Sequence, residues 1–265
     1  MNKMIHAEMR LSNCSAELYI NDIPIKKSDT PFISIPVHEY LVDGENTVAL
    51  VIEPGRTPAQ ARIIGTEKDP EGMVATMRLA KYPVGEFTED ESAQVLVSRT
   101  WNGKSGEDKT FPKLLIEKID LGKNFGRWAW QDAKKLKLND TMIKKIIEVV
   151  KIVHNAYALG KGEPIVQLCH TFTEEVSRAY PSQSPDESDA EFINLLKEYR
   201  SNDDWVIEPL DSKQFDFRLC ADTRLIEIID KNWLPTVRSK PMKDGRPISF
   251  HMFLGIFDEK LQILR

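Results

Sequence analysis

The spacing of apolar residues along the chain changes at Asn139. Before this residue, short runs of aliphatic and β-branched side chains are separated by Asn, Asp, Gly and Pro, as in strands joined by tight turns. After it, apolar residues recur every three or four positions, which indicates amphipathic helices, and they later alternate again. The pattern predicts two domains, an all-β domain followed by an α+β domain.

The first domain, residues 1–122, contains about eight short runs with strand character, which predicts a β-sandwich. Residues 16–20 and 23–25 flank Asn21 and Asp22, two residue types that tolerate the left-handed backbone of a tight turn, so we expect a hairpin there. Further strands are expected at residues 32–37, 46–52, 61–65, 73–82, 94–101 and 113–121.

Two segments of this domain carry a recurrent pattern. Residues 16–25 have the order strand, Asn-Asp turn, strand, and residues 40–50 contain a leucine, two residues, Gly44, one residue, Asn46 and a strand. Over residues 5–55 the pattern resembles galactose-binding-like and related accessory β-sandwich domains, although Asp22 stands where that pattern usually has glycine. The resemblance implies that Gly44 and Asn46 shape a turn, and it does not mark a sugar site.

Carbohydrate recognition by this domain is an alternative that depends on exposed aromatic side chains beside polar loops. Tyr19, Tyr40 and Trp101 are the aromatic residues considered for that role. We favour a core or turn role for them, because large aromatic side chains dominate core burial.

The connecting segment, residues 123–138, contains Trp128 and Trp130, which would point the same way on a strand. They can form a ligand platform or anchor the two domains to each other. We favour the interdomain anchors, because such an interface needs large apolar side chains.

The second domain, residues 139–265, begins with three predicted helices. Asn139 is a suitable N-cap for the first helix, whose apolar stripe ends at Gly160. The second helix opens at Pro164 and ends before Pro181. The third follows Pro185, and Ser188 and Glu191 have the spacing of a capping box. Strands are then expected at residues 215–219, 224–229, 248–257 and 260–264.

Three helices followed by strands, with a final strand, acidic turn and strand at residues 253–263, resemble the nuclear transport factor 2-like superfamily, the cystatin-like α+β cone. The resemblance covers residues 139–265 and implies helices packed on a curved antiparallel sheet. Ketosteroid isomerases, polyketide cyclases and many non-enzymatic pocket proteins share this fold. The enzymes use an acidic base and a polar anchor inside the cone, and no complete set of these groups maps onto this chain.

Four residues are candidates for a pocket in this domain: His154, Asp216, Arg218 and His251. His154 lies on the apolar stripe of the first helix and could act as an acid or base, although a core histidine with one backbone hydrogen bond is the favoured interpretation. Asp216 and Arg218 share one strand face, opposite Phe215, Phe217 and Leu219. These charges line a pocket only if their face turns toward the helices, and alternating strands normally keep polar residues outside.

Other chemistry is weakly supported. His170 and Glu174, one helical turn apart, predict a surface pair, since a metal site would need a third ligand of known position. Cys169 and His170 are neighbours that point roughly 100° apart on a helix, so a cysteine nucleophile is not favoured. No glycine-rich phosphate motif appears, and we expect no nucleotide cofactor and no metal.

Composition limits the partners and the compartment. Residues 1–138 carry 19 Lys and Arg against 20 Asp and Glu (net −1), which leaves 17 against 21 (net −4) for residues 139–265. Basic residues form only short pairs, so nucleic acid is not an expected partner. No apolar run predicts a membrane span. The odd number of cysteines, three, and the polar N-terminus favour a cytoplasmic protein, or a periplasmic or secreted one if a leader was removed.

The first functional hypothesis is a non-catalytic binding protein that recognises a protein partner or a small apolar ligand. The acidic second domain suggests a basic partner. The alternative is a small-molecule isomerase, cyclase or hydratase, with Asp216 or His154 as the base and Arg218 as the charge anchor in an enclosed polar pocket. Homo-oligomerisation through an exposed sheet is left open.

Overall fold

A computed structural model of the chain describes residues 3–53, 58, 67–84, 92–182, 184–243 and 245–265. The chain divides into two compact units, Met1–Arg127 and Trp128–Arg265, which we call unit 1 and unit 2. The division falls inside the predicted connecting segment, residues 123–138. Whether the units are independent domains stays a prediction.

Unit 1 contains strands and the 3-10 helix η1 among its described elements. They are β1 (Lys3–Ser12), β2 (Ala16–Ile20), β3 (Ile23–Ser28), β4 (Phe32–Pro36), η1 (His38–Tyr40), β5 (Glu45–Ile52), β6 (Val74–Pro83), β7 (Gln94–Asn102) and β8 (Lys113–Asp120). The sequence pattern did not delimit β1 as a separate strand. The predicted strand at residues 61–65 lies outside the described residues.

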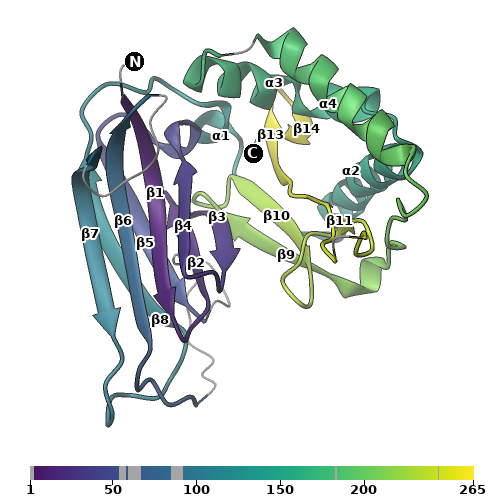
Figure 1. Ribbon diagram of the computed structural model, residues 1–265. Helices are drawn as coiled ribbons and strands as arrows, with labels where there is room; N and C mark the ends of the chain where they lie inside the picture. The colour runs from purple at the N-terminus through teal and green to yellow at the C-terminus, as the bar shows by residue number, and fades with distance from the viewer. Residues whose placement is uncertain (1–2, 54–57, 59–66, 85–91, 183, 244) are drawn as a thin grey trace. The chain divides into compact units, whose positions relative to one another are not determined.

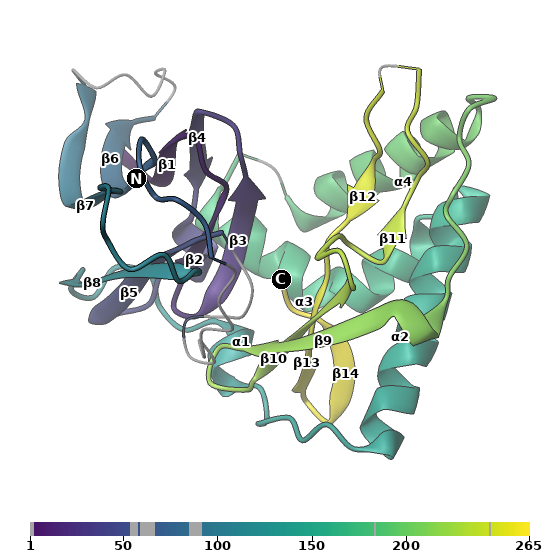
Figure 2. The same cartoon turned by 90° about the horizontal axis from the view of Figure 1, so that it is seen from below.

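The strands of unit 1 form two four-stranded antiparallel sheets, with the orders β4-β1-β6-β7 and β3-β2-β5-β8. Figure 1 and Figure 2 show the sheets as two layers. Alternate residues of β1, among them Ala7 and Met9, are buried, and so are Val48 and Leu50 of β5. Side chains alternate between the faces of a strand, so this spacing places one face of β1 in the apolar interior, whereas residues 48–52 of β5 are buried on both faces of their strand. The prediction of short strands in sheets is confirmed.

The turn that enters β5 is built around the buried amide of Asn46. Its Oδ1 accepts hydrogen bonds from the Val42 N–H (2.8 Å) and the Asn21 side chain (2.9 Å), while its Nδ2 donates to the carbonyls of Val42 (2.8 Å) and Gly44 (3.0 Å). Gly44 has a φ of 82°, a left-handed conformation that glycine adopts without steric cost. Asn21 and Asp22, with φ of 50° and 65°, form the expected hairpin turn between β2 and β3.

Unit 2 contains the helices α1 (Ala129–Asp132), α2 (Asp140–Leu159), α3 (Glu163–Ala179) and α4 (Pro185–Arg200), followed by η4 (Ser212–Gln214). Its strands are β9 (Phe215–Cys220), β10 (Leu225–Asp230), β11 (Val237–Arg238), β12 (Ser249–Phe250), β13 (Phe253–Phe257) and β14 (Lys260–Ile263). The predicted strand at residues 248–257 is therefore two strands, β12 and β13, which belong to different sheets.

The three predicted helices are present as α2, α3 and α4. Asn139 caps α2, since its side chain accepts the N–H of Met142 at 2.9 Å, and Gly160 ends the helix in a left-handed conformation. The capping box predicted at Ser188 and Glu191 is wrong. Ser184 and Glu187 form it instead, because α4 begins at Pro185, a residue that suits the first helical position.

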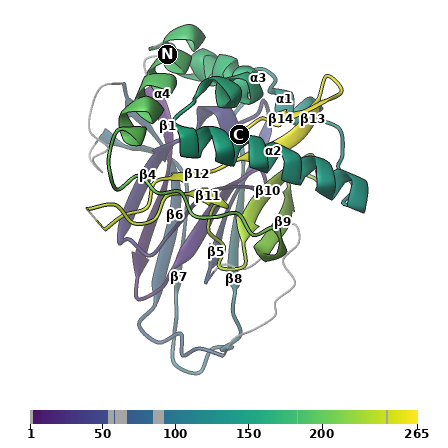
Figure 3. The same ribbon diagram turned by 90° about the vertical axis from the view of Figure 1, so that its right-hand side faces the viewer.

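The main sheet of unit 2 is antiparallel, with the order β14-β13-β10-β9, and β11 pairs with β12. Figure 3 shows the helices of this unit beside the sheet. A single apolar cluster joins the two layers: Ile146, Val150, Val153 and Tyr157 of α2, Ile165 of α3 and Leu196 of α4 lie in it with Ile226, Ile228, Leu254 and Ile263 of the sheet. The α+β class is confirmed in this form, with helices and an antiparallel sheet.

Candidate functional site

The predicted pocket residues of β9 point away from the helices. Phe217 and Leu219 pack against the apolar cluster between helices and sheet, so Asp216 and Arg218 lie on the opposite face. Asp216 is exposed, and its Oδ1 accepts the N–H of Phe217 at 2.8 Å. The carboxylate therefore satisfies a backbone donor of the edge strand, as expected for a residue that protects a sheet edge.

Arg218 is buried and ion-paired. Its Nε donates to the Glu227 carboxylate at 2.6 Å, and Glu227 is the residue directly opposite on β10. The guanidinium carbon of Arg218 lies 5.2 Å from the ring centroid of Trp233, a cation–π distance. Both charges are almost fully removed from water, and each has the other as its partner.

The two histidines of the candidate pocket occupy different settings. His154 is partly buried, and its Nε2 lies 2.8 Å from the carbonyl oxygen of Glu208, so the ring donates to the backbone there. This is the geometry of a core histidine with one backbone hydrogen bond. His251 is exposed between β12 and β13. His154, Asp216 and Arg218 thus each have a separate structural partner, and a shared pocket stays a prediction.

Aromatic residues fill much of the interior between α2, α4 and the strands. The ring centroid of Tyr157 lies 5.0 Å from that of Trp205, and the ring of Tyr199 stacks on Trp205 with 5.2 Å between the centroids. The indole N–H of Trp205 donates to the carbonyl of Tyr157 at 3.2 Å. Burial raises the pKa of the Tyr157 hydroxyl, which therefore stays protonated near neutral pH.

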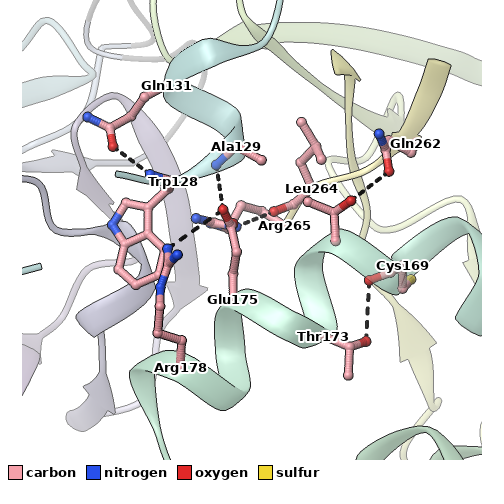
Figure 4. A network of polar contacts seen from close by, with 11 residues as sticks. Trp128, Ala129, Gln131, Cys169, Thr173, Glu175, Arg178, Gln262, Leu264 and Arg265 are labelled. Atoms are coloured by element: carbon pink, nitrogen blue, oxygen red, sulfur yellow. Dashed lines mark hydrogen bonds and ion pairs between the residues drawn. The ribbon is translucent and has the colours of Figure 1, made fainter. Parts of the chain in front are cut away.

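Trp128 belongs to a polar network inside unit 2 (Figure 4). The centroid of its ring lies 4.4 Å from the guanidinium carbon of Arg178 and 5.6 Å from that of Arg265. The buried Glu175 of α3 accepts the N–H of Ala129 and, at 2.6 Å, a hydrogen bond from Arg265 Nη1. The network ties α1 and the segment after β14 to α3.

Both tryptophans of the connecting segment are buried, Trp128 at 2% and Trp130 at 6% exposure. A ligand platform needs an accessible ring face, so their burial argues against that interpretation. Their role as interdomain anchors stays a prediction.

The remaining residues that could bind a metal or act as a nucleophile have structural roles. His170 and Glu174 form the predicted surface pair, with 3.5 Å between Nε2 and Oε1. Among the described residues, no three His, Cys, Asp or Glu side chains are grouped as a metal site would require. Cys14, Cys169 and Cys220 are buried and form no disulfide. Burial raises the pKa of Cys169 to about 12, so its thiol is not a ready nucleophile.

Unit 1 contains a buried carboxylate that the sequence pattern did not predict. Glu8 of β1 is fully buried and faces Arg78 and Tyr82 of β6, with 2.7 Å between its Oε2 and the Arg78 Nε. Tyr82 donates its hydroxyl to Glu8, and burial raises the pKa of Tyr82 to about 12. Both oxygens of Glu8 are occupied by protein donors, which indicates a structural network. The sequence pattern did not predict β1 as a strand, so it offered no signal that Glu8 would be buried.

The aromatic residues considered for sugar binding are buried or partly buried. Tyr19 is fully buried and donates its hydroxyl to Glu17, whereas Tyr40 and Trp101 are partly buried. Trp101 packs edge-on against the buried Phe111, with 6.1 Å between the ring centroids.

Two large aliphatic side chains are exposed on β8, the edge strand of its sheet. Leu114 and Ile116 are 37% and 45% exposed and lie on the same strand face, opposite the buried Leu115. Directly across from them on β5 are Val51 and Ala49, which are buried with Tyr19 in a small apolar cluster. We call Leu114 and Ile116 the β8 patch. The exposed Lys118–Glu45 ion pair lies beside it, with 2.7 Å between the charged atoms.

Unit 1 is expected to lose stability as the pH falls from 6.5 to 4. His38 is 3% exposed, its Nε2 accepts the N–H of Ile5 at 2.8 Å, and burial lowers its pKa from 6.5 to about 4. Between pH 6.5 and pH 4, His38 binds a proton in the unfolded chain but stays neutral in the folded chain. Folding therefore becomes less favourable as the pH falls. We expect a loss of about 2 kcal/mol, part of the shift being screened by water.

Urea unfolding at pH 7 and pH 4.5 measures this loss. The variant His38→Gln offers a neutral acceptor to the same N–H, so its stability should depend less on pH by a similar amount. His6, whose pKa burial also lowers, adds a residual dependence of the same sign in both proteins. Equal pH dependence of the wild type and the variant would exclude His38 as the source.

The comparisons with known proteins do not assign the chain to a family. No helix in the described ranges is long and apolar enough to cross a membrane. No protein-family model, no curated protein and no solved structure matches this chain.

Proposed function

We propose that the chain is a non-catalytic binding protein that recognises a protein partner. The proposal rests on the interior of unit 2. There, aliphatic and aromatic side chains from the helices and from the sheet pack into one cluster. The candidate base His154 bonds a backbone carbonyl, and the candidate charge anchor Arg218 is paired with Glu227. The enzyme hypothesis needs a polar pocket between the helices and the sheet, and apolar side chains pack together in that region. This packing supports the binding proposal.

The isomerase, cyclase or hydratase hypothesis requires a base and a charge anchor that both reach one substrate. Asp216 would be the base, but it lies on the sheet face turned away from the helices and accepts a backbone N–H. Arg218 would be the anchor, but its charge is already neutralised by a buried carboxylate. These placements favour binding over catalysis.

The β8 patch is the proposed contact surface. An exposed apolar pair on an edge strand, flanked by a charged pair, has the apolar centre and polar rim common in protein interfaces. Small-molecule sites are usually concave and enclosed, whereas Leu114 and Ile116 are 37% and 45% exposed. The resemblance of residues 5–55 to accessory β-sandwich domains is consistent with a binding role and rests on fold alone.

Replacing Ile116 by aspartate is expected to weaken partner capture at least tenfold. A buried interface residue contributes through apolar contact, and an aspartate would bring an unpaired charge into that contact. The measurement is the amount of partner retained by the immobilised full chain from lysate of its native cells, quantified against wild type. The matched control is Ile152→Asp, at a residue of α2 that is 47% exposed.

Circular dichroism and the unfolding midpoint should be the same for both variants, because both substitutions are on the surface. Equal capture by wild type and both variants would remove the β8 patch from the proposal. Retention of a small molecule in place of a protein would favour the apolar-ligand alternative.

A further inference from the structure

The β8 patch lies on the edge strand of its sheet. Among the described residues, β8 is the last strand in the order β3-β2-β5-β8 and has β5 as its neighbour. Lys118 of β8 lies opposite Thr47 of β5, whose C=O accepts the N–H of Asn21 and whose N–H donates to the Asn21 side chain, both at 2.9 Å. Asn21 directly follows β2, so both backbone groups of Thr47 point toward β2. Thr47 and Lys118 therefore exchange no backbone hydrogen bonds, and the N–H and C=O groups of Lys118 point away from β5.

Three residues of β8 share this orientation. Backbone and side-chain directions both repeat at every second residue of an antiparallel strand, so the N–H and C=O groups of Leu114 and Ile116 also point away from β5. The side chains of Leu114, Ile116 and Lys118 lie on one face, where the first two are 37% and 45% exposed. A strand placed along this edge would meet the backbone groups and the exposed apolar side chains of the same residues.

The other edge of this sheet, β3, is less suited to strand pairing. It contains Pro24, which has no N–H to donate, and its pairing with β2 shifts register between Leu18 and Tyr19. By contrast, β8 contains no proline between Lys113 and Asp120 and pairs with β5 without a shift. A regular edge strand of this kind can continue its sheet into another chain.

We propose that the partner recognised by the β8 patch is a second copy of this chain, which pairs its own β8 antiparallel to the first. The inference rests on the proposed function and names the partner. Two identical strands related by a two-fold axis pair so that residue i faces residue j and j faces i. Residues with outward backbone groups must also face each other. Only registers that place one residue opposite itself meet both conditions.

The register centred on Leu115 suits both faces of the strand. It places Leu114 opposite Ile116 of the second copy, and it places Lys113 opposite Glu117. Each pair occurs twice because of the symmetry. Two aliphatic pairs would form on the exposed face and two pairs of opposite charge on the other face, and both kinds of cross-strand pair stabilise a sheet.

The neighbouring registers are less favourable. A centre at Ile116 would place Leu114 opposite Lys118, an apolar side chain against a charge. A centre at Glu117 would place its two carboxylates opposite each other, and like charges directly opposite destabilise a sheet. A centre at Leu114 would place Ile116 opposite Pro112, which has no N–H to donate. The sequence of β8 therefore favours the centre at Leu115.

Sedimentation equilibrium of the purified full chain tests the self-pairing. We expect a dimer of twice the mass of one chain. Its dissociation constant should rise at least roughly tenfold in Ile116→Asp, because an unpaired charge would enter the apolar contact with Leu114. The matched control Ile152→Asp, at a residue of α2 that is 47% exposed, should dimerise as the wild type does. A monomeric wild type, or equal dimerisation of the two variants, would overturn the proposal.

Single cysteines test the register without a buried charge. An equimolar mixture of Leu114→Cys and Ile116→Cys chains should form a mixed disulfide under mild oxidation, since these positions face each other in the dimer. Each variant alone should form much less, because positions two residues apart across the strands are farther from each other. The three native cysteines are buried, and the wild type serves as the control for their reaction. A disulfide that forms chiefly between two Ile116→Cys chains would overturn the register centred on Leu115.

Photocrosslinking at position 116 separates this inference from the proposed function. An adduct of twice the mass of one chain would support self-pairing. A chain that stays monomeric and forms an adduct with a different protein would overturn self-pairing and leave the recognition of a protein partner intact.

Discussion

Replacing Asn46 by alanine is expected to lower the free energy of unfolding of unit 1 by about 3 kcal/mol. Asn46 is fully buried, and its side-chain amide makes four hydrogen bonds, to both backbone groups of Val42, to the carbonyl of Gly44 and to the side chain of Asn21. Alanine removes all four of these hydrogen bonds from the partly buried groups of Val42, Gly44 and Asn21. Urea unfolding followed by tryptophan fluorescence and far-UV circular dichroism measures the loss.

The neighbouring Glu45 provides the control for this substitution. Its carboxylate is 62% exposed and pairs with the equally exposed Lys118, so Glu45→Ala should change stability little. A loss from Asn46→Ala as small as that from Glu45→Ala would contradict the structural role that we assign to this turn.

Replacing Glu175 by alanine is expected to destabilise unit 2 by about 3 to 5 kcal/mol, because breaking a buried ion pair strands the remaining charge. Arg265 is 4% exposed and would keep its guanidinium in the interior without the carboxylate. The N–H of Ala129 would also lose its acceptor. Thermal and chemical unfolding of the full chain measure the change, read from probes in unit 2.

Two further variants isolate the ion pair. Glu174→Ala removes the adjacent carboxylate, which is 57% exposed and pairs with His170, and should have little effect. The double variant Glu175→Leu/Arg265→Met replaces both charges by apolar side chains and should recover much of the lost stability. If Glu175→Ala and Glu174→Ala behaved alike, the network would not stabilise unit 2.

The sequence predicted the elements well where local signals sufficed. Asn139 marks the start of α2 and Gly160 marks its end. Both could be predicted because a side-chain cap and a left-handed glycine act within a few residues of the chain. The cap of α4 was misplaced because Ser188 also has a glutamate three residues later. The N-cap is Ser184, four residues before Ser188, and the helix begins at Pro185, whose ring fixes a helical φ.

The surroundings of the candidate site residues could be predicted less well from the sequence. Alternation in β9 separated Asp216 and Arg218 from the phenylalanines, but which face meets the helices depends on tertiary packing. The partner of Arg218, Glu227, is set by the register of β9 on β10, and Glu8 meets Arg78 across 70 residues of sequence. Such pairings depend on strand order, which a single sequence does not specify.

Site-specific photocrosslinking in the native cells tests the proposed function most directly. A photoreactive phenylalanine analogue replaces Ile116 in the β8 patch, and in a separate protein it replaces the exposed Ile152 of α2. We expect a discrete protein adduct from position 116 and none of that mass from position 152. Absence of any adduct at position 116, or the same adducts at both positions, would contradict partner recognition through the β8 patch.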